Sequence, residues 1–166
     1  MFRDGRFLTR RKNQRRVRRV DETTIGAADG DLGSINASRN YTHCSRNTHC
    51  CEYCQLPQQA VPFFTFHIEH ITARQHGGDD DPSNLALACP DRNAHKGPNL
   101  TSIDPNTGQL VSLFGPRLHL WNEHFQLQGP RIFGRTPIGR ATVRLLAMND
   151  EDRLDMRREL QELGDM

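Results

Sequence analysis

The sequence is short of the residues that build a large apolar core. Of its 166 residues, 35% are hydrophobic and 7% are aromatic, with one tryptophan and two tyrosines, and the mean hydropathy is −0.73. A chain of this size and polarity suits one modest domain with tails or a small appendage. A bound metal would compensate for the small core, because metal ligation replaces apolar burial in small scaffolds.

Long apolar runs and an even set of cysteines are missing as well. No stretch of the sequence approaches the ~18 apolar residues needed to span a membrane. The arginine-rich N-terminus lacks the apolar segment of a secretory signal. The five cysteines, an odd number, do not form the even framework of a disulfide-stapled secreted domain. We therefore expect a cytoplasmic protein with no membrane partner.

Positive charge is concentrated at one end of the chain. Residues 1–20 carry a charge of +8, from nine Lys/Arg residues and one Asp, whereas the remaining chain carries −6. A basic arm on an acidic body is typical of segments that contact phosphate backbones. We interpret residues 1–45 as a basic, disordered arm and linker. A solvated tail without a partner is the alternative. The candidates for phosphate contacts in the arm are Arg15, Arg16, Arg18 and Arg19.

The middle of the chain predicts an α+β unit in the order strand, loop, strand, helix. Residues 63–68 are aromatic and β-branched, which indicates a first strand. Residues 77–82 have the Gly, Asp and Pro of a loop, and the apolar run at 85–89 suggests the partner strand. Pro90 then opens a helix that Gly97 and Pro98 stop.

The chain beyond residue 100 predicts an extension that ends in helices. Residues 109–114 form a candidate strand, and Thr136-Pro137 is typical of a helix start. Asn149 or Asp150 is the expected cap of a last, charged helix. We therefore divide the chain into an arm at 1–45, a core at 46–100 and an extension at 101–166.

Four short motifs in the core carry residues suited to chemistry. Each is weak by itself, since a lone histidine is usually structural. In chain order they are Cys51-Glu-Tyr-Cys54, His67-Ile-Glu69-His70-Ile, Asn84-Leu-Ala-Leu-Ala-Cys89 and Asn93-Ala-His95-Lys96. Together, and in this secondary-structure order, they resemble the HNH endonuclease family with its small ββα-metal fold. Residues 101–146 resemble the tail of a small bacterial subgroup of that family.

The resemblance implies a metal-dependent endonuclease that hydrolyses phosphodiester bonds in DNA by a one-metal mechanism. His70 corresponds to the general base, and a histidine side chain ordinarily titrates near pH 6.5, about where a base is useful. Asn84 corresponds to the residue that ties the loop across the hairpin. Glu69 and Asn93 correspond to the ligands of one divalent ion, and oxygen ligands favour Mg²⁺ or Mn²⁺.

Three further residues near these motifs have less specific roles. Lys96 corresponds to a lysine of the family and could contact a phosphate or pack its stem. Arg74 could contact DNA, and solvation at the surface is the equal alternative. His67 shares a strand face with Glu69 and is a candidate accessory ligand.

The zinc site of the family is incomplete in this sequence. Relatives hold a structural Zn²⁺ with two Cys-x-x-Cys pairs, and structural zinc takes four N or S ligands. Here the first pair is Cys51 and Cys54, but the second has Cys89 followed by Arg92 in place of the fourth thiolate. Zinc would need another ligand, such as His95, His49 or Cys50, or it would be lost. Both outcomes stay open.

Two non-catalytic interpretations compete with the nuclease. The chain could be a zinc-ribbon-like nucleic-acid-binding module in which the basic arm makes the contacts, or a degenerate enzyme weakened by Arg92. Glu69-His70 together with Asn93 favours the nuclease, because a binding module needs no general base beside a metal carboxylate. The sequence predicts neither the sequence preference nor the oligomeric state.

Deleting residues 1–20 should weaken DNA binding and flatten its dependence on salt. Each phosphate that a cationic side chain neutralises contributes about 0.9 to the slope of log K against log salt. A fluorescence-anisotropy titration at several salt concentrations measures the slope, and an arm of equal length with its Lys/Arg residues changed to Gln is the control for chain length. An unchanged slope would show that the arm is a passive tail.

Overall fold

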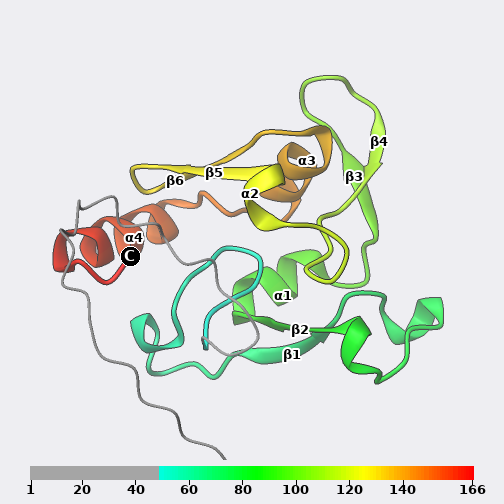
Figure 1. Cartoon of the computed structure of the whole chain (residues 1–166), viewed down its shortest axis with the longest axis horizontal. Helices are drawn as coiled ribbons and strands as arrows, with labels where there is room; N and C mark the ends of the chain where they lie inside the picture. Colours follow the sequence, from blue (N-terminus) through cyan, green and yellow to red (C-terminus); the bar gives the residue numbers. More distant parts are fainter. Residues whose placement is uncertain (1–48) are drawn as a thin grey trace, which may run out of the picture. The chain divides into compact units, whose positions relative to one another are not determined.

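The structure is a computed structural model that describes residues 49–166 (Figure 1). The basic arm expected at 1–45, with its candidate arginines, lies outside these residues. The described part is α+β, as predicted, and its strands pair as antiparallel hairpins. None of its helices is long and apolar enough to cross a membrane. The elements are η1 (Gln58–Ala60), β1 (His67–His70), η2 (Arg74–His76), η3 (Pro82–Asn84), β2 (Leu85–Ala88), α1 (Pro90–Lys96), β3 (Thr101–Ile103), β4 (Leu110–Ser112), α2 (Trp121–His124), β5 (Phe125–Gln128), β6 (Arg131–Gly134), α3 (Pro137–Leu145) and α4 (Glu151–Leu163).

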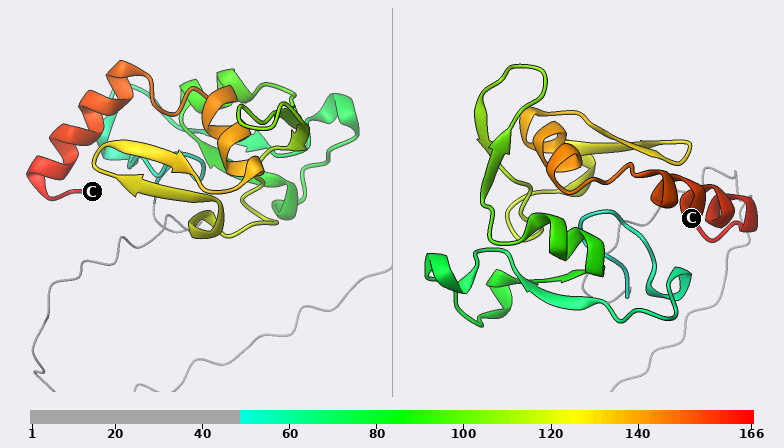
Figure 2. Two further views of the ribbon diagram at one scale, coloured as in Figure 1. Left: turned by 90° about the horizontal axis from the view of Figure 1, so that it is seen from above. Right: turned by 180° about the vertical axis from the view of Figure 1, so that it is seen from behind.

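A ββα unit forms the centre of the predicted core, in the expected order of strand, loop, strand and helix. β1 and β2 pair antiparallel, with His70 opposite Leu85 and Glu69 opposite Ala86. One face of this hairpin is buried at Glu69, Ala86 and Ala88. α1 follows β2 directly, with Pro90 in its first turn, and lies against the hairpin (Figure 2).

The first strand begins later than its sequence pattern predicts. The aromatic run at 63–68 indicated a strand, but β1 begins at His67, and the side chain of Phe64 is largely exposed. Gln58 explains the difference. Its amide donates to the carbonyl of Phe64 at 2.5 Å and accepts from the backbone N–H of Phe66 at 2.7 Å. A side chain thus satisfies the backbone groups that a partner strand would otherwise pair.

The extension contains the two helices that were predicted and two hairpins. Thr136 caps α3, and its hydroxyl accepts from the N–H of Gly139 at 3.1 Å. Asp150 precedes α4. The β5–β6 hairpin was not predicted, although its first strand alternates as Phe-Gln-Leu-Gln and a glycine with positive φ, Gly129, follows it.

Polar anchors tie the extension to the segment around the Cys51–Cys54 turn. The carboxylate of Glu52 is buried, accepts from the backbone N–H of Leu87 at 2.9 Å and pairs with the guanidinium of Arg117, whose Nη2 lies 2.8 Å from Oε1. The indole N–H of Trp121 donates to the carbonyl of Tyr53 at 2.8 Å. Arg117 and Trp121 belong to residues 101–146, the part that resembles the tail of the family's small bacterial subgroup. The structure gives them an anchoring role.

A buried ion pair holds α3 against the β3–β4 hairpin. The carboxylate of Asp104 is fully buried and accepts two hydrogen bonds from Arg140, each of 2.8 Å, and one from the hydroxyl of Thr107, also of 2.8 Å. The hydrogen bond from Arg140 holds the pKa of Asp104 well below its usual value. The hairpin turn therefore depends on an ionised carboxylate that a residue on α3 stabilises.

Asp104→Asn should lower the melting temperature near neutral pH by a few degrees, because it removes the charge that Arg140 pairs with. The folded-state pKa of Asp104 is depressed, so its contribution is present above the unfolded value of about 3.9 and is lost as pH falls through the folded value. The difference in melting temperature between wild type and Asp104→Asn should thus narrow below about pH 4. Thermal melts followed by circular dichroism at several pH values measure it.

Asp155→Asn is the matched control. Asp155 pairs with Arg158 on the exposed face of α4, and exposed pairs contribute little to stability. An Asp104 variant that melts like the Asp155 variant at neutral pH would contradict the anchoring role of Asp104.

Candidate functional site

Neighbouring residues at the end of β1 present an imidazole and a carboxylate to opposite faces of the hairpin. The side chain of His70 is one quarter exposed, at 25%, whereas that of Glu69 is buried at 4%. The pleat of a strand explains the separation, because successive side chains point to opposite faces. The structure thus places a candidate base where water reaches it and a candidate metal ligand on the face that α1 covers.

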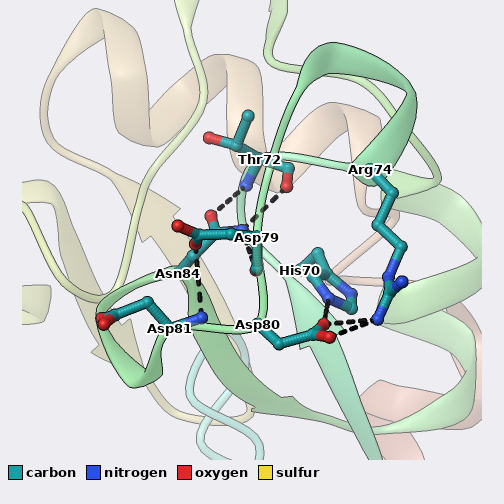
Figure 3. A network of polar contacts seen from close by, with 7 residues as sticks. All are labelled: His70, Thr72, Arg74, Asp79, Asp80, Asp81 and Asn84. Atoms are coloured by element: carbon teal, nitrogen blue, oxygen red, sulfur yellow. Dashed lines mark hydrogen bonds and ion pairs between the residues drawn. The ribbon is translucent and has the colours of Figure 1, made fainter. Parts of the chain in front are cut away.

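Asn84 is the last residue of η3, directly before β2, and its side chain holds the loop that joins the two strands. Its side-chain oxygen accepts from the backbone N–H of Thr72 at 2.8 Å, and its amide nitrogen donates to the carbonyls of Thr72 at 3.0 Å and Asp79 at 2.9 Å. These bonds join both ends of the loop (Figure 3). The arrangement agrees with the loop-tying role that the sequence predicted for Asn84.

Lys96 points into the protein and contacts Glu69. Its ammonium nitrogen is 2.5 Å from Oε1 of Glu69 and donates to the carbonyls of His70 at 3.3 Å and Ile71 at 3.0 Å. Burial raises the pKa of Glu69, and the charge of Lys96 opposes that rise. The side chain of Lys96 is 2% exposed, so in this structure it does not present its charge to a phosphate, which was one of the two roles expected for it.

The remaining candidate ligands, Asn93 and His67, contact each other across α1 and β1. The amide nitrogen of Asn93 lies 2.9 Å from Nδ1 of His67. If that amide nitrogen donates to the imidazole, the amide oxygen of Asn93 stays available to a cation. The structure thus brings Asn93 and Lys96 on α1 to the β1 face that carries His67 and Glu69.

A carboxylate that the sequence interpretation assigned only to the loop contacts the candidate base. Oδ1 of Asp80 is 2.8 Å from Nε2 of His70, and Nη2 of Arg74 lies 2.5 Å from both oxygens of the same carboxylate. Arg74, a candidate for DNA contact, is therefore paired but still largely exposed. The run of three Asp residues at 79–81 was the only sequence signal for Asp80, and such a run is also ordinary loop chemistry.

Three thiols gather away from the hairpin end, between the Cys51–Cys54 turn and the start of α1. Their sulfur atoms lie within 4.8 Å of one another, all three residues are buried, and Sγ of Cys54 is 3.9 Å from Sγ of Cys89. Burial raises the pKa of Cys51, whereas hydrogen bonds from Cys51 and Cys89 lower the pKa of Cys54. The cluster therefore favours a thiolate at Cys54 and could bind a soft metal such as zinc.

The described residues offer three candidate ligands, whereas a structural zinc takes four. No other His, Cys, Asp or Glu atom from residues 49–166 joins the cluster. Cys50 forms a disulfide and His49 is exposed. Nε2 of His95 lies 4.0 Å from a carboxylate oxygen of Asp150. None of the three substitutes considered from the sequence thus completes the site in this structure.

Arg92, which stands at the position of the fourth thiolate, anchors α1 to the extension. Its guanidinium is buried, donates to the carbonyl of Ala147 and lies 3.6 Å from a carboxylate oxygen of Asp150. Its charge also helps to lower the pKa of Cys54, after the thiol hydrogen bonds. The arginine therefore favours a thiolate at Cys54 and holds the connection between α3 and α4.

Comparison with known proteins identifies the family of this segment. Residues 51–99 match the family model described as HNH endonuclease. No curated protein and no solved structure matches the chain. An HNH domain indicates a nuclease or nucleic-acid-binding function and a nucleic-acid partner. The matched residues contain the ββα unit and the three thiols, so the expected family is confirmed for this part of the chain.

Arg92→Cys should bind zinc more tightly than wild type, because it supplies a fourth thiolate. It also removes the anchor to Ala147, so Arg92→Ala, which loses the same anchor without gaining a thiol, is the matched control. With zinc at 100 times its dissociation constant, binding to the folded state adds about 2.7 kcal/mol. The Cys variant should then melt at a higher temperature than the Ala variant and lose that advantage on chelation.

Metal analysis and thermal melts of the three proteins decide the question. One tightly held zinc in wild type would mean that a residue outside 49–166 or a further ligand completes the site. No zinc in the Cys variant would show that the turn does not keep the family geometry.

Proposed function

We propose that the HNH endonuclease domain at residues 51–99 hydrolyses phosphodiester bonds in DNA, with His70 as the general base. The observation that carries the proposal is the pair of side chains at the end of β1. Two residues adjacent in sequence place a partly exposed imidazole and a buried carboxylate on opposite faces of the strand. A module that only binds nucleic acid has no use for this combination.

The reaction needs a proton acceptor at the attacking water. His70 takes one proton from that water, and the oxygen of the resulting hydroxide forms a bond to phosphorus. The bond from phosphorus to the leaving oxygen breaks, and that oxygen takes a proton from solvent. Lys96 donates to the backbone carbonyl of His70, so the strand end that carries the base is fixed to α1.

Glu69 and Asn93 are the residues that would hold a divalent cation. Oε2 of Glu69 is buried and makes no well-formed hydrogen bond within residues 49–166, although the hydroxyl of Tyr53 interacts with this carboxylate. A buried carboxylate oxygen that is not fully paired suits Mg²⁺ or Mn²⁺, which prefer oxygen ligands. When bound, such an ion would neutralise charge that develops on the phosphate and the leaving oxygen.

One observation favours a second candidate, a nucleic-acid-binding module without catalysis. The ammonium of Lys96 already lies 2.5 Å from Glu69 and neutralises it inside the protein. A divalent ion would have to share this carboxylate with Lys96. The two candidates differ in one measurable property, which is the cleavage of DNA in the presence of added metal.

Wild-type protein should nick supercoiled plasmid in Mg²⁺ or Mn²⁺ and stop in EDTA. His70→Ala should lower the nicking rate about 10²–10⁴-fold, the usual contribution of a general base, with little change in DNA affinity. His76→Ala is the matched control, because His76 lies exposed on η2 in the same loop. Nicking by His70→Ala at the rate of His76→Ala would refute the assignment, and DNA binding without nicking by wild type would support the second candidate.

A further inference from the structure

The loop between β1 and β2 delivers a carboxylate to the ring of His70. Oδ1 of Asp80 lies 2.8 Å from Nε2 of the imidazole. The same carboxylate receives Nη2 of Arg74 at 2.5 Å from each oxygen. Figure 3 shows the carboxylate of Asp80 between the imidazole and the guanidinium. The other ring nitrogen of His70, Nδ1, takes no part in this contact.

The position of Asp80 is set by the backbone of the loop. The amide of Asn84 donates to the carbonyl of Asp79, the residue directly before Asp80. On the other side, the N–H of Gly78 donates to the carbonyl of Ala73 at 3.2 Å. A Cβ atom at Gly78 would lie 1.7 Å from the carbonyl oxygen of Thr72, so the loop approaches the strand end as closely as only glycine allows.

The contact of Asp80 with His70 contributes little to stability by itself. The side chain of Asp80 is 65% exposed and that of Arg74 is 68% exposed, and ion pairs at such exposure have small effects on folding. The hydrogen bonds from His70 and Arg74 hold the pKa of Asp80 below its usual value, so the carboxylate stays ionised at neutral pH. What the contact can do is orient the ring.

We propose that Asp80 is a positioning residue for His70, held in place by Arg74, and that it selects the imidazole tautomer needed for catalysis. The inference rests on the proposed function, in which His70 is the general base. A carboxylate that accepts from Nε2–H keeps the proton of the neutral ring on that nitrogen, and the lone pair of Nδ1 is then free to take the proton of the attacking water. After the transfer, the ring is positive and the ionised Asp80 stabilises it.

Kinetics of Asp80→Asn against Asp79→Asn test the catalytic part of this inference. The two variants remove the same charge from adjacent positions of one loop, but within residues 49–166 the side chain of Asp79 accepts only from the N–H of Asp81, at 3.3 Å. We expect kcat for plasmid nicking to fall about 10–100-fold in Asp80→Asn, a part of the effect of a general base. KM should be the same in both variants, and Asp79→Asn should keep the kcat of wild type.

The ¹⁵N chemical shifts of the imidazole nitrogens of His70 test the tautomer without reference to activity. When the ring is neutral, wild type should show a protonated Nε2 and an unprotonated Nδ1. Asp79→Asn should keep this pattern. Asp80→Asn should shift both nitrogens toward averaged values, because the amide no longer favours one tautomer. A merely structural role of Asp80 in the loop would leave the shifts unchanged.

The outcomes separate this inference from the proposed function. If nicking requires His70 but is equal in the two Asp variants, or if the ¹⁵N pattern of Asp80→Asn is that of wild type, the positioning role is refuted and the nuclease stands. If wild type does not nick DNA with Mg²⁺ or Mn²⁺, the proposed function fails, and the catalytic role of Asp80 fails with it. A loss of kcat together with averaged shifts, in Asp80→Asn alone, supports the inference.

Discussion

The ion pair of Glu69 and Lys96 is the interaction on which the candidate site depends. Both side chains are almost completely buried, so each charge would be costly without the other. Removing one partner of such a pair commonly destabilises a protein by about 3–5 kcal/mol. The pair joins β1 to α1, and the same ammonium holds the carbonyls of His70 and Ile71. Lys96 thus fixes both the backbone at the candidate base, His70, and the position of the candidate ligand, Glu69.

In this protein, buried polar groups hold together segments that apolar packing holds together in larger proteins. The chain has few aromatic residues, and its described core is assembled from small segments. Arg117, Trp121, Arg92 and Arg140 each reach from one segment to an acceptor on another. Directional bonds specify a single arrangement of short elements, and they are costly to leave unmade in the interior. The polar composition and the defined fold are therefore compatible.

Local signals predicted more of this structure than patterns of hydrophobicity did. The ends of α1 and the start of α3 follow from Pro90, Gly97 and Thr136, whose effects act within one turn. The strand predicted from residue 63 begins only at His67, because the side chain of Gln58 satisfies the backbone groups of Phe64 and Phe66, and the hydrophobic pattern does not reveal such a contact. In the site, the motifs that resemble the family named His70, Glu69 and Asn84, and their catalytic roles stay predictions. For Lys96 the sequence left two directions open, toward a phosphate or into the protein, and the structure has the inward one.

Side chains of the extension bond to the segment that matches the family. The matched stretch is therefore shorter than the stretch of chain that packs together. The match ends at residue 99, yet Glu52, Tyr53 and Arg92 find partners beyond that limit. A segment cut at the limits of the match would leave the charge of Arg92 and the carboxylate of Glu52 without these partners. The motif can therefore be recognised in the sequence by itself, but the segment that carries it depends on contacts with the extension. Any chimaera that borrows its hairpin must also carry the partners that the extension provides, which are the donors Arg117 and Trp121 and the carbonyl of Ala147.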